Sequence, residues 1–157
     1  MAGRGNRGGL LRERGDAWFL CGVAAELADV LWLQGRDDEA LELTLVSENT
    51  VGRGVLVAQM MWRGARAKVL ARRGQLDEAE ALAHEAVAII ETTEYVLYRA
   101  DALTDLAEVL RQMNRSDEAA TTAEEARRLY ETKGNVAAVR NLDRLLDELP
   151  AAKPLAR

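Results

Sequence analysis

The stretch RAKVLARRGQLDEAEALAHEA, residues 66–86, decides the fold of this chain. It contains a run of good helix formers, a glycine at position 74, and a second run of helix formers that opens with the triplet Asp77-Glu78-Ala79. Glycine is common where a helix ends in left-handed backbone, and acidic residues are favoured in the first turn of a helix. The stretch therefore predicts two helices joined by a tight turn.

The same pattern occurs three times in the chain. The triplet Asp-Glu-Ala stands at 38–40, 77–79 and 117–119, which gives spacings of 39 and 40 residues. Other positions recur in the same register, including the turn residues Gly35, Gly74 and Asn114, the alanines at 28, 67 and 107, and the Val-Leu pairs at 30, 69 and 109. Recurrence of so many positions at one offset indicates a repeat protein.

Helical periodicity of the apolar residues predicts seven helices, at about 16–34, 37–48, 55–73, 76–91, 94–113, 116–132 and 136–149. The first six form three hairpins, and the seventh packs on the last hairpin as a cap. Asn114 can replace glycine at its turn because asparagine tolerates left-handed backbone. The recurring alanines allow two helices to approach closely, so the two helices of each hairpin should meet there. We expect an all-α fold, a right-handed α-solenoid of three hairpins with a C-terminal capping helix.

The expected domain organisation follows the repeat. Residues 1–15 are expected to form a flexible basic arm and 150–157 a disordered tail, with the helical repeat domain at 16–149 between them. Within that domain the units are about 16–54, 55–93 and 94–135, followed by the cap at 136–149.

Composition limits the classes of function. The net charge of −5 disfavours nucleic acid as the main partner, because phosphate contacts dominate that affinity. Cys21 is the one cysteine, so no disulfide within the chain and no oxidising compartment is implied. The apolar segment 17–33 contains two acids, which argues against a membrane span. We expect a cytoplasmic protein without cofactor or metal.

The small-residue pattern, the glycine turn and the Asp-Glu-Ala signature together resemble the tetratricopeptide repeat family. The phrases that carry the resemblance are RAKVLARRG at 66–74, EALAHEA at 80–86, RADALTDLAEVLR at 99–111 and LYETKGN at 129–135. The period is longer than the family's usual value of about 34 residues. The long-repeat variety at the C-terminal end of actinobacterial nucleotide cyclases and ATPase-linked transcriptional regulators is similar. The resemblance implies a non-catalytic module that binds a protein or peptide.

The resemblance also implies a binding site, the concave groove formed by the first helix of each hairpin. The groove positions carried over for partner binding are Asp29, Trp32, Lys68, Arg72, Thr104, Glu108 and Arg111. Trp32 has two interpretations: it is either an exposed interface anchor or a side chain that packs on the neighbouring hairpin. With Asp101 as a further groove position, three acids are expected to balance three bases, and the basic residues are too few for a clamp on a peptide carboxylate.

Other functions stay open beside this one. A self-associating structural module that forms a homodimer through the N-terminal hairpin is the second, with Trp18 and Phe19 as candidate contacts, because terminal repeats need a polar outer face to stay soluble. A small-molecule-sensing regulatory domain is a third and has no specific residue behind it. An enzyme is not expected, because no nucleophile, base and orienting group converge and His84 has no second histidine for a metal pair.

Overall fold

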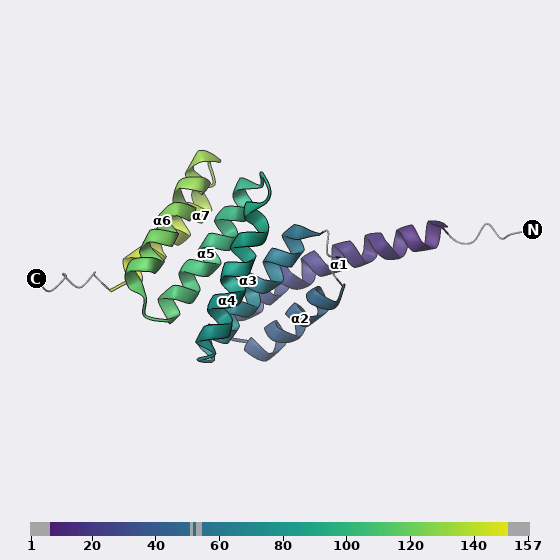
Figure 1. Cartoon of the computed structure of the whole chain (residues 1–157), viewed down its shortest axis with the longest axis horizontal. Helices are drawn as coiled ribbons and strands as arrows, with labels where there is room; N and C mark the ends of the chain where they lie inside the picture. Colours follow the sequence, from purple (N-terminus) through teal and green to yellow (C-terminus); the bar gives the residue numbers. More distant parts are fainter. Residues whose placement is uncertain (1–6, 51, 53–54, 151–157) are drawn as a thin grey trace, which may run out of the picture.

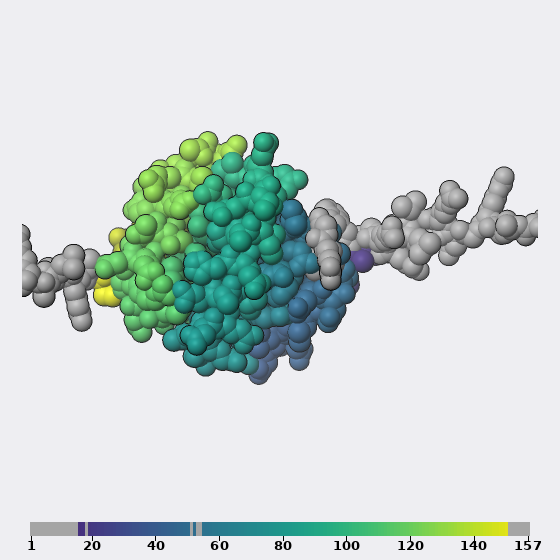
Figure 2. Space-filling view, viewed as in Figure 1, coloured from purple at the N-terminus to yellow at the C-terminus, as the bar shows by residue number. Residues whose placement is uncertain are grey.

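The structure is a computed structural model that describes residues 7–50, 52 and 55–150, with side chains from Asp16 onward except at position 18. Within this part of the chain there are seven α-helices and no strand, which confirms the all-α helical-repeat architecture. The helices are α1 (Arg7–Leu33), α2 (Asp37–Thr50), α3 (Leu56–Arg72), α4 (Leu76–Glu91), α5 (Val96–Gln112), α6 (Ser116–Thr132) and α7 (Val136–Glu148). They form three successive hairpins and a final helix along the long axis of the molecule (Figure 1), seen as consecutive colour bands in Figure 2.

The start of α1 differs from the sequence expectation. The helix begins at Arg7 rather than near residue 16, so residues 7–15 of the expected flexible arm are helical. The residues at 10–14 are all good helix formers, and extending an existing helix costs far less than starting one. Residues 1–6, the rest of that arm, and 151–157, most of the expected tail, lie outside the described part of the chain.

The turns inside the hairpins have the backbone that the sequence predicts. Gly35, Gly74 and Asn114 have φ angles of 74°, 80° and 59°. At the second turn the Gln75 amide donates to the Leu70 carbonyl oxygen at 2.9 Å, which satisfies one of the carbonyls that a helix end leaves without a partner. The substitution of asparagine for glycine in the third unit is therefore confirmed, since Asn114 is the one non-glycine residue with positive φ in the described chain.

The hairpins close on small residues. The six alanines at positions 28, 40, 67, 79, 107 and 119 are all completely buried, as expected for a seam where two helices approach closely. Two polar side chains are also buried in the first hairpin, and one of them, Ser47, donates a hydrogen bond to the Cys21 carbonyl oxygen at 2.8 Å. This bond ties α2 to α1 without leaving a buried polar group unsatisfied.

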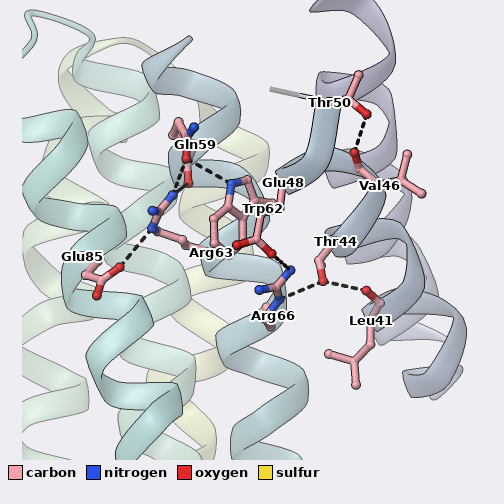
Figure 3. Close-up of polar contacts among 10 residues, drawn as sticks. All are labelled: Leu41, Thr44, Val46, Glu48, Thr50, Gln59, Trp62, Arg63, Arg66 and Glu85. Carbon is pink, nitrogen blue, oxygen red and sulfur yellow. Dashed lines mark hydrogen bonds and ion pairs between the residues drawn. The ribbon is translucent and has the colours of Figure 1, made fainter. Parts of the chain in front are cut away.

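The contact between the first and second hairpins is built around Trp62 of α3 (Figure 3). Its ring is 3% exposed and lies between two guanidinium groups, with Arg63 and Arg66 at 4.2 and 4.4 Å from the ring centroid. Arg66 reaches α2, where it donates to Thr44 Oγ1 at 3.0 Å and pairs with Glu48 at 2.7 Å. Arg63 instead pairs with Glu85 of α4 at 3.0 Å. The two arginines that flank the Trp62 ring therefore connect α3 to α2 and to α4.

The last helix closes the C-terminal end of the solenoid. Leu142 of α7 is 1% exposed and joins the core of the second and third hairpins. Asn135 caps α7, because its side chain accepts a hydrogen bond from the Ala138 amide at 3.2 Å. Arg127 of α6 also holds α7 in place through an ion pair with Asp143 at 2.8 Å. The capping role expected for this helix agrees with these contacts.

Candidate binding groove

The first helices of the hairpins line a continuous groove. Its C-terminal half is a hollow of about 580 Å³ between α1, α3, α5 and α7, and its other half is a hollow of about 810 Å³ between α1, α3 and α5. Met61 of α3 lines both, so the two halves adjoin. Of the seven expected partner-binding residues, five line the C-terminal half: Asp29, Trp32, Lys68, Thr104 and Glu108.

Lys68 is the centre of the C-terminal half. Its side chain is 7% exposed, and its Nζ lies 2.6 Å from Asp105 Oδ1 and 2.8 Å from Asp29 Oδ1. Burial would lower the pKa of Lys68, but the charges of the two carboxylates outweigh burial and raise it. Lys68 is therefore a fixed cation that is shared between α1 and α5.

Asp105 is the residue of this cluster that the sequence analysis missed. Burial raises the pKa of its carboxyl group to about 7, and the neighbouring charge of Lys68 opposes that rise. The Asp105 side chain fits against α3 because Gly64 has no side chain: a Cβ at Gly64 would stand 2.1 Å from Asp105 Oδ2. A glycine inside a helix, on the same face as a buried lysine, is the sequence signal that could have pointed to this close approach.

A second hydrogen-bonded group joins α6 to the floor of the groove. The Tyr130 hydroxyl donates to Asp101 Oδ1, and Thr104 Oγ1 lies 3.5 Å from the same hydroxyl oxygen. Burial raises the pKa of both Asp101 and Tyr130, and the hydrogen bond between them opposes the rise at Asp101 and adds to it at Tyr130. Tyr130 comes from the second helix of its hairpin, so it was absent from the set of first-helix positions.

Trp32 combines the two interpretations that the sequence left open. Its partly buried ring packs on α3, with Lys68 Nζ at 4.8 Å and the Arg72 guanidinium at 4.6 Å from the ring centroid. It also lines the groove beside Asp29. It therefore packs on the neighbouring hairpin and remains available at the groove wall.

Two of the expected cations are not among the residues that line the groove. Arg72 donates to the Trp32 carbonyl oxygen at 2.8 Å and to Asp37 Oδ1 at 2.7 Å, so it connects the first two hairpins. Arg111 donates to both oxygens of Glu108, at 2.8 and 2.7 Å. Both guanidinium groups are already bound within the protein.

The charge of the groove is consequently acidic rather than balanced. The C-terminal half is lined by five carboxyl groups and two cations: Asp29, Asp101, Asp105, Glu108 and Glu148, with Lys68 and Arg144; of the carboxyl groups, Glu108 is already paired with Arg111. Among the described residues, the other half is lined by Glu26 and Glu94 and by no cation. Carboxylates close together in a partly enclosed surface attract positive charge.

The half of the groove near the start of α5 is apolar and aromatic. Phe19 is 66% exposed there, and the exposed Tyr95 and Tyr98 meet edge to face with their ring centroids 6.1 Å apart. Phe19, a candidate for self-association, thus lies at the groove. The side chain of Trp18, the other candidate, lies outside the described part of the chain.

The one histidine of the sequence lies away from the groove. His84 lies on α4, exposed, with its Nε2 3.7 Å from Glu80 Oε1, and it is not among the groove residues. In the described ranges no three His, Cys, Asp or Glu side chains are grouped so that they could hold a metal ion. No helix within those ranges is long and apolar enough to cross a membrane.

A comparison with known protein families matches two of the three hairpins. Residues 56–132, just under half of the chain, match the family model described as tetratricopeptide repeat, and they span α3 to α6. No curated protein and no solved structure matches the chain. The resemblance to one particular class of bacterial regulators is not tested by this match. Residues 56–132 are thus similar to tetratricopeptide repeats, a kind of helical repeat that generally serves as a protein-interaction module.

Proposed function

We propose that this chain is a non-catalytic interaction scaffold whose groove binds a segment of a partner protein. The segment carries an aromatic or large aliphatic side chain next to basic residues. The observation that supports this choice is the division of the groove into an apolar half and an acidic half that meet at Met61.

The acidic half favours a basic segment for two reasons. Its carboxyl groups outnumber its cations, so it attracts lysine and arginine side chains. In addition, the ammonium group of Lys68 already pairs with two carboxylates within 2.8 Å, so it binds an acidic ligand poorly. The same charge balance disfavours a peptide carboxylate or a nucleic acid.

The apolar half supplies an anchor. Phe19, Tyr95 and Tyr98 present aromatic surface to a hollow of about 810 Å³, which has room for a large side chain. Aromatic residues at the centre of an interface commonly contribute most of the binding energy. The glutamates at 26 and 94 stand beside these rings, so a cation next to the anchor also finds a partner.

The resemblance of the sequence to the repeat regions of bacterial regulators supports a regulatory role for this binding. In that role the chain holds a partner protein in place and performs no chemistry of its own.

The experiment is a titration of the chain with labelled synthetic peptides followed by fluorescence anisotropy. One peptide combines leucine and tryptophan with arginine, a second replaces each arginine by glutamate, and a third keeps the arginines but replaces the apolar residues by serine. We expect binding of the first alone, weakened by added salt because the charges at the groove rim are screened.

Variants test whether the groove is the site. Glu94→Lys and Glu148→Lys reverse charge in the apolar and acidic halves, and each should weaken binding of the arginine peptide. Glu124→Lys makes the same change on α6, at an exposed residue that lines neither half, and should leave binding unchanged. Equal binding of the arginine and glutamate peptides, or an equal loss in all three variants, would contradict the proposal.

A further inference from the structure

The outer face of α1 carries an apolar stripe that no other helix of the described chain covers. It consists of Leu20, Val23, Leu27 and Val30, which are 48%, 40%, 45% and 46% exposed. Their spacing of three, four and three residues places them in one row along the helix. The opposite side of α1 carries Cys21, Ala24 and Ala28, which are fully or almost fully buried.

The repeat register shows what kind of surface this stripe is. Val30 corresponds to Val69 of α3 and Val109 of α5, and both of these are completely buried. Val23 corresponds to Trp62 and Ala102, which are 3% and 0% exposed. Val69 packs with Ala28, Leu31 and Ala40 of the first hairpin, and α3 and α5 each contact the preceding hairpin. Val23 and Val30 therefore lie on the face of α1 that corresponds to the hairpin-joining face of α3 and α5, and here they are exposed.

The two ends of the solenoid differ in this respect. At the C-terminal end α7 buries Leu142 and carries four exposed charged residues, of which Arg144 and Glu148 line the groove and Arg140 and Asp147 do not. A polar outer face is what a terminal repeat needs to remain in water. Among the residues whose side chains the structure describes, α1 has no such polar cover over its stripe, whereas the one exposed large apolar side chain of α7 is Val136.

We propose that the stripe on α1 binds the same stripe on a second copy of the chain. The stripe continues the interface already used twice inside the molecule, and its spacing of three and four is the spacing with which two helices pack side by side. A patch that binds the same patch on a second copy does so about a two-fold axis. Such pairing closes after two copies and does not grow into a filament.

The size of the patch predicts a weak dimer. Each copy contributes four side chains that are already about half buried, which is less surface than a standard protein interface provides. We therefore expect a dissociation constant in the micromolar range. The stripe shares Val23 with the apolar half of the proposed groove, whereas none of its four residues lines the acidic half.

The test is sedimentation velocity of the purified chain over a concentration series from low to high micromolar. We expect the mean sedimentation coefficient to rise with concentration and to level off at the value of a dimer. A monomer throughout the series would overturn the proposal. Species that continue to grow beyond two copies would overturn the closed, two-fold arrangement.

A pair of matched variants locates the interface. Leu27→Lys places a charge in the middle of the stripe and should raise the dissociation constant at least tenfold. The helix should accommodate it, because Arg66 occupies the same register position in α3. Leu45→Lys is the control, an identical change at a leucine of α2 that is 50% exposed and lies outside the stripe.

The control should dimerise as the unchanged chain does. Loss of the dimer in both variants, or in Leu45→Lys alone, would overturn the assignment to α1. Circular dichroism at the helical band should be the same for all three proteins. If Leu27→Lys loses helical signal, Val30→Gln provides the same test with a smaller change, and its failure to weaken the dimer would count against the proposal.

Discussion

Replacing Gly64 by alanine should destabilise the protein, although alanine is the better helix former. In the middle of an exposed helix this exchange gains about 0.5–1 kcal/mol. At Gly64 the new Cβ would stand 2.1 Å from Asp105 Oδ2, where ordinary contacts begin near 3.4 Å. The carboxylate would have to move by more than an ångström, and its other oxygen is held 2.6 Å from Lys68 Nζ.

The magnitude follows from two opposing contributions. Overpacking of a close helix contact costs about 1–3 kcal/mol, against which the gain in helix propensity is smaller. We expect Gly64→Ala to lower the free energy of unfolding by about 1–2 kcal/mol in urea denaturation followed by circular dichroism. In an Asp105→Ala background the same exchange should become stabilising, because the carboxylate it would meet is gone.

Gly22 provides the matched control within the same protein. It also lies inside a helix, but a Cβ there meets nothing within 4 Å. Gly22→Ala should therefore raise the free energy of unfolding by about 0.5–1 kcal/mol. If Gly64→Ala is as stable as Gly22→Ala, the close approach of α3 and α5 around Asp105 is not as described, and the reasoning fails.

Three further predictions concern the remaining features. The pKa of Asp105 is about 7 in the folded protein and roughly 3.9 in the unfolded chain. The protonated carboxyl group therefore stabilises the fold fully below the lower pKa, and this stabilisation is lost as the pH rises through 7. The urea concentration at the unfolding midpoint should fall between pH 5 and 8, and Asp105→Asn should flatten that dependence. Trp62→Ala should cost about 3–5 kcal/mol of unfolding free energy, because a 3% exposed ring between two guanidinium groups is removed; a cost under about 1 kcal/mol in the same assay would show that the ring does not hold the two hairpins together. Gly74→Ala should cost about 1 kcal/mol at its φ of 80°, whereas Asn114→Gly should be neutral or slightly stabilising at 59°, and thermal melts that rank the two in the opposite order would contradict the left-handed turns.

The sequence was sufficient for the architecture because the repeat supplies the same information three times. The register of the Asp-Glu-Ala triplets located the turns, and it predicted a left-handed asparagine at position 114 where the other units have glycine. The alanine seams followed from the same alignment, since small residues recurring at the same offset on two helices imply that those helices touch. Such local rules needed no knowledge of distant contacts.

The groove was predicted less completely, because its chemistry depends on which side chains bind one another. Arg72 and Arg111 have the right spacing to face a ligand, but they are bound to Asp37 and Glu108. Asp105 reads in sequence as one more acid of a surface helix, and only the glycine across from it on α3 shows that it points inward. The groove is therefore acidic, whereas the sequence alone predicted a balance of acids and bases.

The enclosed ammonium group of Lys68 has a practical consequence for labelling. Reagents that couple to amines need an accessible, deprotonated amino group, and Lys68 is 7% exposed with a pKa raised by two carboxylates. Lys133, in the exposed turn after α6, offers such a reagent a far more accessible target. A dye attached through amines will thus leave the centre of the groove chemically intact, and enzymes that acylate lysines will find the same residue out of reach.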